Sequence, residues 1–258
     1  MTIQYIDRKT SECCQEKVAG ESYLKWSCQT KLGRSLTNIA GSRRWLSQLA
    51  GLYQNRKTSK KLIRRFVIDM DIDMTEAVRE SPEEYYSFND FFARTLKPEA
   101  RPVCSCANAI ISPADGRALA YKSFENDRIL QVKGKTFSAA ELLNNKQLAM
   151  RLAGGPVLVI RLNPSDYHRF HFPTDNRPSA AKHYGGRYYS VNPIALNTWD
   201  EVYCRNRRDV TILSTLNWGS MAMIEVGAAL VGSVVQTFLP GQSVTKGMEK
   251  GCFQLGGS

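Results

Sequence analysis

The sequence VLVIRLNPSDYHRFH, at residues 157–171, joins an apolar segment to a polar one. Val157 to Ile160 is an unbroken apolar run rich in β-branched residues, which predicts a buried β-strand. The strand leads into a polar segment that holds His168 and His171, two of the three histidines, beside Asp166. Histidine has the unperturbed pKa nearest neutrality, so the pair offers proton transfer in either direction. Two other interpretations stay open: a metal site, which an H-x-x-H pair without a third ligand supports weakly, and two core imidazoles.

A β-rich pattern continues on both sides of this run, from Pro102 to the end of the chain. Short apolar runs broken by turn residues predict strands. Gly227 and Gly232 interrupt the last run, at points where backbone must approach backbone or ligand closely. Ser138 and Glu141 form a capping box that predicts a short helix. The predicted strands are 109–111, 129–132, 157–160, 210–216 and 221–238.

The first hundred residues carry apolar side chains at helical spacing instead. Trp45, Leu49 and Leu52 recur at intervals of four and three, and residues 62–67 repeat the pattern. Three helix-start signals accompany them: Ser42, Ser59 and the run Ser81-Pro82-Glu83-Glu84. The predicted fold class is therefore α+β. A basic helical region at 1–100 precedes a β-rich domain at 101–258, which holds all three histidines.

Positive charge is concentrated in the helical region. The chain has 35 Lys and Arg against 24 Asp and Glu, a net charge of +11. Residues 22–68 hold eleven Lys or Arg and no acidic residue, so the charge of this stretch equals the net charge of the whole chain. Such a concentration of positive charge indicates an anionic partner. A basic helix with Trp, Leu and Tyr on its other face suits an anionic phospholipid membrane, and packing of that face on its own domain is an equal alternative. Nucleic acid is disfavoured, because no recognised binding motif accompanies the charge.

The sequence shows no signal for crossing a membrane or for export. No apolar run reaches about eighteen residues, and the N-terminus is too polar for a signal peptide. We therefore expect a cytosolic protein, peripheral on the cytoplasmic face of a membrane if it meets lipid. The seven cysteines are an odd number scattered over the chain, which predicts reduced thiols. The oligomeric state is left open, a homodimer included.

The chain ends in Gly256-Gly257-Ser258. A serine hydroxyl beside an unhindered glycine carbonyl can attack that carbonyl and convert the amide to an ester, because glycine reaches geometries closed to other residues. On the tripeptide alone, a flexible terminus is the simpler interpretation. Asp115 also has a simpler interpretation: it belongs to an Asp-Gly pair, and such pairs favour tight turns.

Six motifs, spread over nearly the whole chain, together resemble those of the phosphatidylserine decarboxylase family and occur in the same order. They are SFNDFFARTLKPEARP (87–102), SPADGR (112–117), DYHRFHFP (166–173), YYSVNPIALN (188–197), VGAALVGSV (226–234) and KGMEKGCFQLGGS (246–258). The resemblance implies a self-processing enzyme that converts phosphatidylserine to phosphatidylethanolamine at an anionic membrane surface.

The resemblance also assigns roles to individual residues. It implies self-cleavage between Gly257 and Ser258, with His171 as base and Asp115 as the group that orients it. Ser258 becomes a covalent pyruvoyl cofactor, which forms a Schiff base with the serine amine of the lipid and accepts electrons as carbon dioxide leaves. His168 matches the histidine that protonates the resulting carbanion. No metal is implied.

One departure from the family pattern keeps other functions open. The family continues past the processing serine as a small α chain that stays bound after cleavage, whereas this sequence stops at Ser258. We expect the gene product to continue. A catalytically inactive, truncated membrane-surface protein on the same fold is the alternative. A hydrolase that uses Ser258, His171 and Asp115 is disfavoured, because the chain has no G-x-S-x-G motif.

Overall fold

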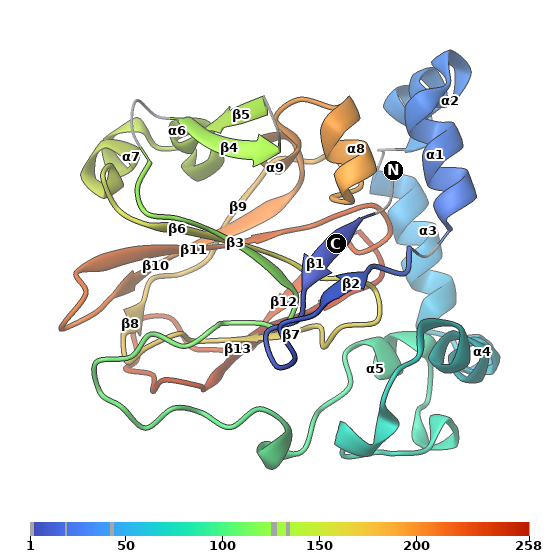
Figure 1. The fold of residues 1–258 in the computed structure, drawn as a ribbon, viewed down its shortest axis with the longest axis horizontal. Coiled ribbons are helices and arrows are strands. Elements are labelled where there is room, and N and C mark those ends of the chain that lie inside the picture. The colour runs from blue at the N-terminus through green and yellow to red at the C-terminus, as the bar shows by residue number, and fades with distance from the viewer. Residues whose placement is uncertain (1–2, 19, 42–43, 125–127, 133–134, 258) are drawn as a thin grey trace.

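A computed structural model describes residues 3–18, 20–41, 44–124, 128–132 and 135–257 (Figure 1). The N-terminal helices gather on one side of the molecule, and the strands occupy the other. These helices are α1 (Glu21–Gln29), α2 (Lys31–Leu36), α3 (Arg44–Gln54), α4 (Lys61–Met70) and α5 (Phe88–Phe92). The arrangement confirms the α+β class, and the predicted domain boundary at residue 100 stays a prediction. None of the helices among the described residues is long and apolar enough to cross a membrane.

Two antiparallel sheets form the centre of the β-rich part. In the first, β10 (Arg208–Ser214) pairs with β11 (Ser220–Val226) on one edge and with β8 (Arg177–Pro178) and β9 (Lys182–Tyr184) on the other. In the second, β13 (Glu249–Gln254) lies between β12 (Ser233–Gln236) and β7 (Arg169–His171). Two-stranded pairs are formed by β3 (Arg117–Tyr121) with β6 (Val157–Arg161) and by β4 (Arg128–Val132) with β5 (Lys135–Ser138).

Short helices complete the core of the β-rich part. Their bounds are α6 (Ala139–Leu143), α7 (Lys146–Leu152), α8 (Pro193–Thr198) and α9 (Val202–Arg205). Phe137, Leu143, Val202 and Val210 belong to one buried apolar cluster, which joins these helices to β5 and β10. Removal of this apolar surface from water, at roughly 25 cal/mol per Å², is the main force that holds the helices on the strands.

An N-terminal hairpin, which the sequence did not predict, precedes the helices. Its strands are β1 (Gln4–Ile6) and β2 (Cys13–Gln15), with Tyr5 opposite Cys14. Glu16 follows directly and is almost fully buried, where its carboxylate accepts hydrogen bonds from Arg161 and Asn163. The hairpin therefore belongs structurally with the β-rich part, although the rest of the N-terminal third is helical.

Several local predictions are confirmed. Helices α3 and α4 cover the two predicted amphipathic runs, and β4 covers 129–132. Ser138 caps α6 by accepting a hydrogen bond from the backbone N–H of Glu141 (3.0 Å). The capping box at Ser81 is present, but it opens only a 3₁₀ turn at Pro82–Glu84. The predicted cap Ser42 lies outside the described residues.

Three predictions are wrong. Residues 109–111 form no strand in the described chain; Ile111 instead donates its backbone N–H to the carbonyl of Pro173 (2.9 Å). Ser59 does not cap α4, because its hydroxyl donates to Gln54 and accepts from the backbone N–H of Phe88. The strand at 157–160 exists but is only partly buried: Leu158 is 50% exposed, and within the described part of the chain β6 pairs with β3 alone.

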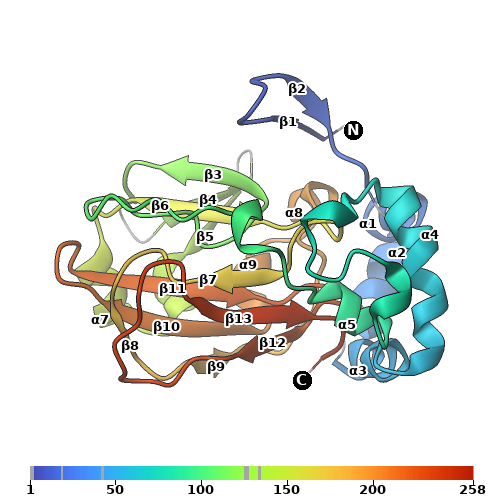
Figure 2. The same cartoon turned by 90° about the horizontal axis from the view of Figure 1, so that it is seen from below.

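Helices α3 and α5 bring the N-terminal part against the end of the chain. Figure 2 shows β13 running toward α5 and α3. The side chains of Phe88, Phe91 and Phe92 form a buried aromatic cluster against which Leu255 packs. A Cβ atom on Gly51 of α3 would lie 2.6 Å from the Cα of Gly256, so only glycine fits there. The last described residues therefore lie between the N-terminal helices and the β-rich part.

Candidate active site

The segment that leads into Gly257 is held by backbone hydrogen bonds. Gly256 donates its N–H to the carbonyl of Leu230 (2.7 Å) and accepts from the N–H of Gly232 (2.7 Å). A Cβ atom on Gly232 would lie 2.6 Å from the Gly256 carbonyl oxygen, which confirms the predicted close approach of backbone to backbone. Gly257 itself is buried. Ser258 lies outside the described residues.

Strand β7 and the residue before it place the two predicted catalytic histidines beside β13. His171 is opposite Glu249, at the start of β13. The carbonyl of His168 accepts a hydrogen bond from the N–H of Phe253 (2.8 Å), at the end of β13 that leads to Gly257. His171 therefore ends β7 and His168 directly precedes it, on the side that is nearer in register to Gly257.

His168 is a buried and neutral imidazole. Its side chain is only 3% exposed, and the ring lies against that of Phe92 with 3.8 Å between centroids. Burial lowers its pKa to about 3, and the nearby positive charge of Arg94 acts in the same direction. Nδ1 lies 2.9 Å from the carbonyl oxygen of Asp166. Because a carbonyl only accepts, Nδ1 carries the proton, and Nε2 keeps the lone pair that can take up a second one.

His171 and Asp115 lie on neighbouring segments without touching through their side chains. The backbone N–H of His171 donates to the carbonyl of Pro113 (2.7 Å), and its ring stacks on Tyr167 at 5.8 Å between centroids. Burial lowers the pKa of His171, whereas the charges of Glu249 and, to a smaller extent, Asp115 act to raise it. The Asp115 carboxylate is bound by Arg101, at 2.6–2.9 Å. Among the described residues, no hydrogen bond joins Asp115 to His171.

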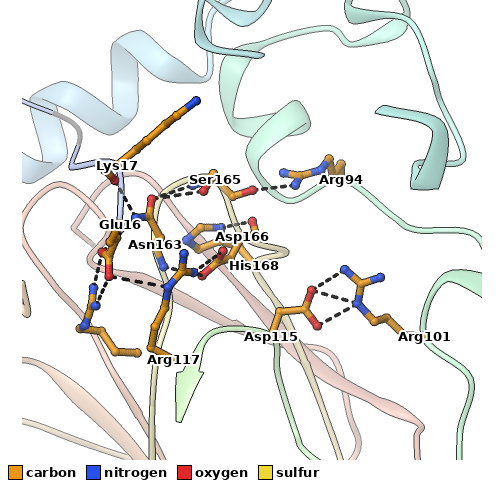
Figure 3. A network of polar contacts seen from close by, with 11 residues as sticks. Glu16, Lys17, Arg94, Arg101, Asp115, Arg117, Asn163, Ser165, Asp166 and His168 are labelled. Carbon is orange, nitrogen blue, oxygen red and sulfur yellow. Dashed lines mark hydrogen bonds and ion pairs between the residues drawn. The ribbon is translucent and has the colours of Figure 1, made fainter. Parts of the chain in front are cut away.

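A network of charged groups fixes the loop that carries His168 (Figure 3). The carboxylate of Asp166 accepts from Arg117 (2.8 Å) and from the backbone N–H of Asn163 (2.7 Å). Glu16 binds Arg161 and Asn163 and lies 3.6 Å from Arg117. Burial acts to raise the pKa of Glu16, but the hydrogen bond and charge of Arg161 outweigh it and keep the carboxylate ionised. The network holds the Asp166 carbonyl that orients the His168 ring.

A cavity of about 190 Å³ opens beside Asp115 and Tyr167. Arg94 contributes to its wall and is itself 4% exposed. One guanidinium nitrogen of Arg94 donates to the carbonyl of Ser165 (2.9 Å), while Nε and Nη1 have no hydrogen-bond partner among the described residues. Arg94 therefore places a buried positive charge next to His168, and the negative charges of Asp166 and Asp115 act on it without a hydrogen bond in the described part of the chain.

Comparisons with known proteins show to which family the chain is related. Residues 88–258 match the sequence profile of the family described as phosphatidylserine decarboxylase. The chain is 42% identical over 256 residues to the phosphatidylserine decarboxylase proenzyme of Clostridium perfringens (strain SM101 / Type A), across 99% of this chain and 87% of that protein. It is 43% identical to the proenzyme of Clostridium botulinum (strain 657 / Type Ba4), across 99% of this chain and 86% of that protein. The chain belongs to the phosphatidylserine decarboxylase family.

Within this member of the phosphatidylserine decarboxylase family, the structure brings part of the predicted site together. His168 and the segment before Gly257 are joined by a backbone hydrogen bond, and Asp115 is close enough for its charge to act on His171. The sequence did not predict the partners that hold these residues, Arg94, Arg101 and Arg117. All three lie in or beside motifs quoted for the resemblance, but nothing in a linear motif indicates which carboxylate or carbonyl each arginine contacts.

Proposed function

We propose that this chain decarboxylates phosphatidylserine and that it generates its own pyruvoyl group from Ser258 by cleaving the Gly257–Ser258 bond. Family membership over nearly the whole chain carries the proposal. Both relatives are named proenzymes, which accords with a chain that is processed. The buried Gly257, at the end of a fixed backbone segment, supports it, because an acyl shift needs a carbonyl held in one geometry.

In the cleavage step, the Ser258 hydroxyl attacks the Gly257 carbonyl and His171 takes up the hydroxyl proton. The lowered pKa of His171, caused by burial, keeps the imidazole neutral at pH 7 and able to accept it. Asp115 acts through its negative charge, which stabilises the imidazolium that forms. Arg101 holds the Asp115 carboxylate in place and moderates this effect.

A pyruvoyl group supplies a ketone that condenses with an amine and accepts electrons when carbon dioxide leaves. The chain must then deliver a proton to the substrate carbon, and we assign this step to His168. In the free protein the ring is neutral, because burial and Arg94 both disfavour the charged form and lower its pKa. An anionic substrate beside Arg94 offsets that positive charge and favours the charged imidazole, while burial, the larger cause of the lowered pKa, still opposes it.

Mass spectrometry of the full-length protein tests the proposal. Processing predicts a β fragment that ends at Gly257 and an α fragment blocked by pyruvate, and Ser258→Ala stays intact and inactive. His168→Ala is expected to cleave but not to decarboxylate. Cleavage that survives Ser258→Ala would overturn the mechanism, and an intact wild-type chain would favour the inactive alternative.

We further propose that α3 lies on the surface of an anionic membrane. Its apolar face is exposed: Trp45 is 52%, Leu49 57% and Leu52 61% accessible. In contrast, α4 packs Ile63 into the aromatic cluster under α5. The same periodic pattern thus produces a covered face in α4 and an uncovered one in α3. Further exposed apolar residues of this region are Tyr23, Trp26, Leu32, Leu36 and Ile39. Such a face beside many cations suits the headgroup region of a bilayer.

Vesicle binding tests the membrane proposal. Deletion of 22–68 would remove the contact between Gly51 and Gly256, so point substitutions are the sharper tool. Leu49→Gln with Leu52→Gln is expected to weaken binding to phosphatidylserine vesicles at low salt at least tenfold, since each loses roughly 1.5–3 kcal/mol of apolar burial. Leu216→Gln, at a position 98% exposed in the β10–β11 turn, is the matched control and should bind like wild type. Equal binding by all three chains would overturn the proposal.

A further inference from the structure

The side chain of Asn89 forms hydrogen bonds with the backbone just before the predicted cleavage site. Asn89 is on α5 and is 3% exposed. Its Oδ1 accepts from the N–H of Leu255 (2.8 Å), and its Nδ2 donates to the carbonyl of Leu255 (2.9 Å). Both polar groups of one residue are thus bound by one side chain that is 166 positions away in the sequence.

This contact replaces a strand partner. A primary amide offers one acceptor and one donor side by side, the same pair that a peptide group presents to a neighbouring strand. Strand β13 ends at Gln254, and at the next residue, Leu255, Asn89 supplies the hydrogen bonds that a neighbouring strand would make. Nδ2 also donates to Oδ1 of Asn55 (2.8 Å), which fixes the orientation of the amide. Asn89 is therefore set to recognise backbone in an extended conformation, whatever the side chain at 255.

The opposite side of the same segment is fixed as well. Gly256 is bound by Leu230 and Gly232, and Gly51 of α3 packs against its Cα. Two residues in succession before Gly257 are therefore held by hydrogen bonds. Little rotational freedom remains between this anchor and the carbonyl of Gly257, which lies one residue beyond it.

We propose that Asn89 is a positioning residue for self-cleavage: it fixes Leu255 and Gly256 so that the Gly257 carbonyl is presented to the Ser258 hydroxyl. In that step the oxygen of Ser258 bonds to the carbonyl carbon of Gly257, and the bond from that carbon to the Ser258 nitrogen breaks. The hydroxyl proton passes to the nitrogen, which leaves an ester and a free amine. This inference rests on the proposed self-cleavage. Asn89 does not touch the reacting atoms and acts through Leu255.

The test compares cleavage rates of proenzyme made in a cell-free pulse. Asn89→Leu cannot make either hydrogen bond to Leu255 and is expected to cleave roughly 10- to 100-fold more slowly, the penalty typical of a misplaced reacting group. Asn55→Ala removes only the outer partner and should stay within about threefold of wild type. Leu142→Ala, in the core cluster of the β-rich part, is the control for a general loss of stability that arises away from Asn89. Melting temperatures of all chains are measured in parallel.

The pH dependence distinguishes positioning from packing, and hydroxylamine identifies which step is slowed. Hydroxylamine cleaves esters, so it cannot rescue Asn89→Leu if the acyl shift itself is slowed. In Asn89→Asp, the protonated acid again offers a donor and an acceptor, whereas the carboxylate opposes the Leu255 carbonyl. Its cleavage rate relative to wild type should therefore rise as pH falls from 8 to 5.5. The nearest acid on α5, Asp90, is bound by Arg79 (2.7 Å), and both are common to the two chains.

Three outcomes are decisive. The inference is supported if Asn89→Leu cleaves more slowly than Leu142→Ala although the two chains have equal melting temperatures. It also requires that the cleavage rate of Asn89→Asp relative to wild type rises as the pH falls. Wild-type cleavage by Asn89→Leu, or a slowing matched by Leu142→Ala, overturns it while leaving the self-cleavage proposal intact. An uncleaved wild-type chain overturns the self-cleavage proposal and this inference with it.

Discussion

Replacement of His168 by asparagine isolates the energetic consequence of burying an imidazole at the candidate active site. The Nδ2 of asparagine occupies about the place of Nδ1 and can keep the hydrogen bond to the Asp166 carbonyl (2.9 Å). The substitution therefore removes the titratable group and leaves its polar contact. Both chains carry Ser258→Ala, so that they stay uncut and unfold from the same covalent state.

The magnitude follows from the pKa of His168, about 3 in the folded chain against 6.5 for the ordinary group. Between these values the unfolded chain binds the proton and the folded chain does not. The stability of the folded state is therefore complete above pH 6.5 and falls as the pH is lowered toward 3. The loss from this one group is about 2 kcal/mol at pH 5 and approaches about 5 kcal/mol below pH 3.

The assay is urea unfolding at pH 7.5 and pH 5.0, followed by the fluorescence of the four tryptophans. The chain with His168 is expected to lose about 2 kcal/mol more between the two pH values than the His168→Asn chain. His171→Asn is the matched control: that ring is only half-buried, so its effect should be smaller. Equal pH dependence in the chain with His168 and in the His168→Asn chain would refute a buried, neutral His168.

Two further predictions concern buried charge and use the same uncut background. Glu16→Gln breaks the ion pair with Arg161 and should lower the free energy of unfolding in urea by about 3 kcal/mol. Hydrogen exchange in the hairpin at 4–15 should become faster. The control Glu12→Gln, at an exposed position, should change neither quantity. Lys250→Met leaves Glu225 buried without its partner at 2.9 Å and should cost about 3–5 kcal/mol. Adding Glu225→Gln should recover part of that loss, and a double variant no more stable than Lys250→Met would contradict the reasoning.

Local chemistry in the sequence was sufficient for much of the fold. The helices α3 and α4, the strand β4 and the cap of α6 at Ser138 follow from periodicity and capping rules that act over a few residues. The motifs were also sufficient for the family, since they mark residues whose chemistry is fixed by type. The β1–β2 hairpin escaped prediction, because two three-residue strands carry too little periodicity to be recognised.

What the sequence could not determine is which partner each group meets. Periodicity shows that α3 and α4 each have an apolar face, but only docking decides that the face of α3 points outward. The turn at Asp115 is local, whereas its partner Arg101 comes from another segment.

The contact between Asn89 and Leu255 has the same origin. It exists only because α5 docks against the end of β13, and no rule based on nearby residues connects positions 166 apart. The sequence by itself therefore determined the family, the local elements and the residue types available for chemistry. Only the tertiary structure decided how those residues are held, because hydrogen bonds and ion pairs between distant segments depend on sheet register and helix docking, which local propensities do not specify.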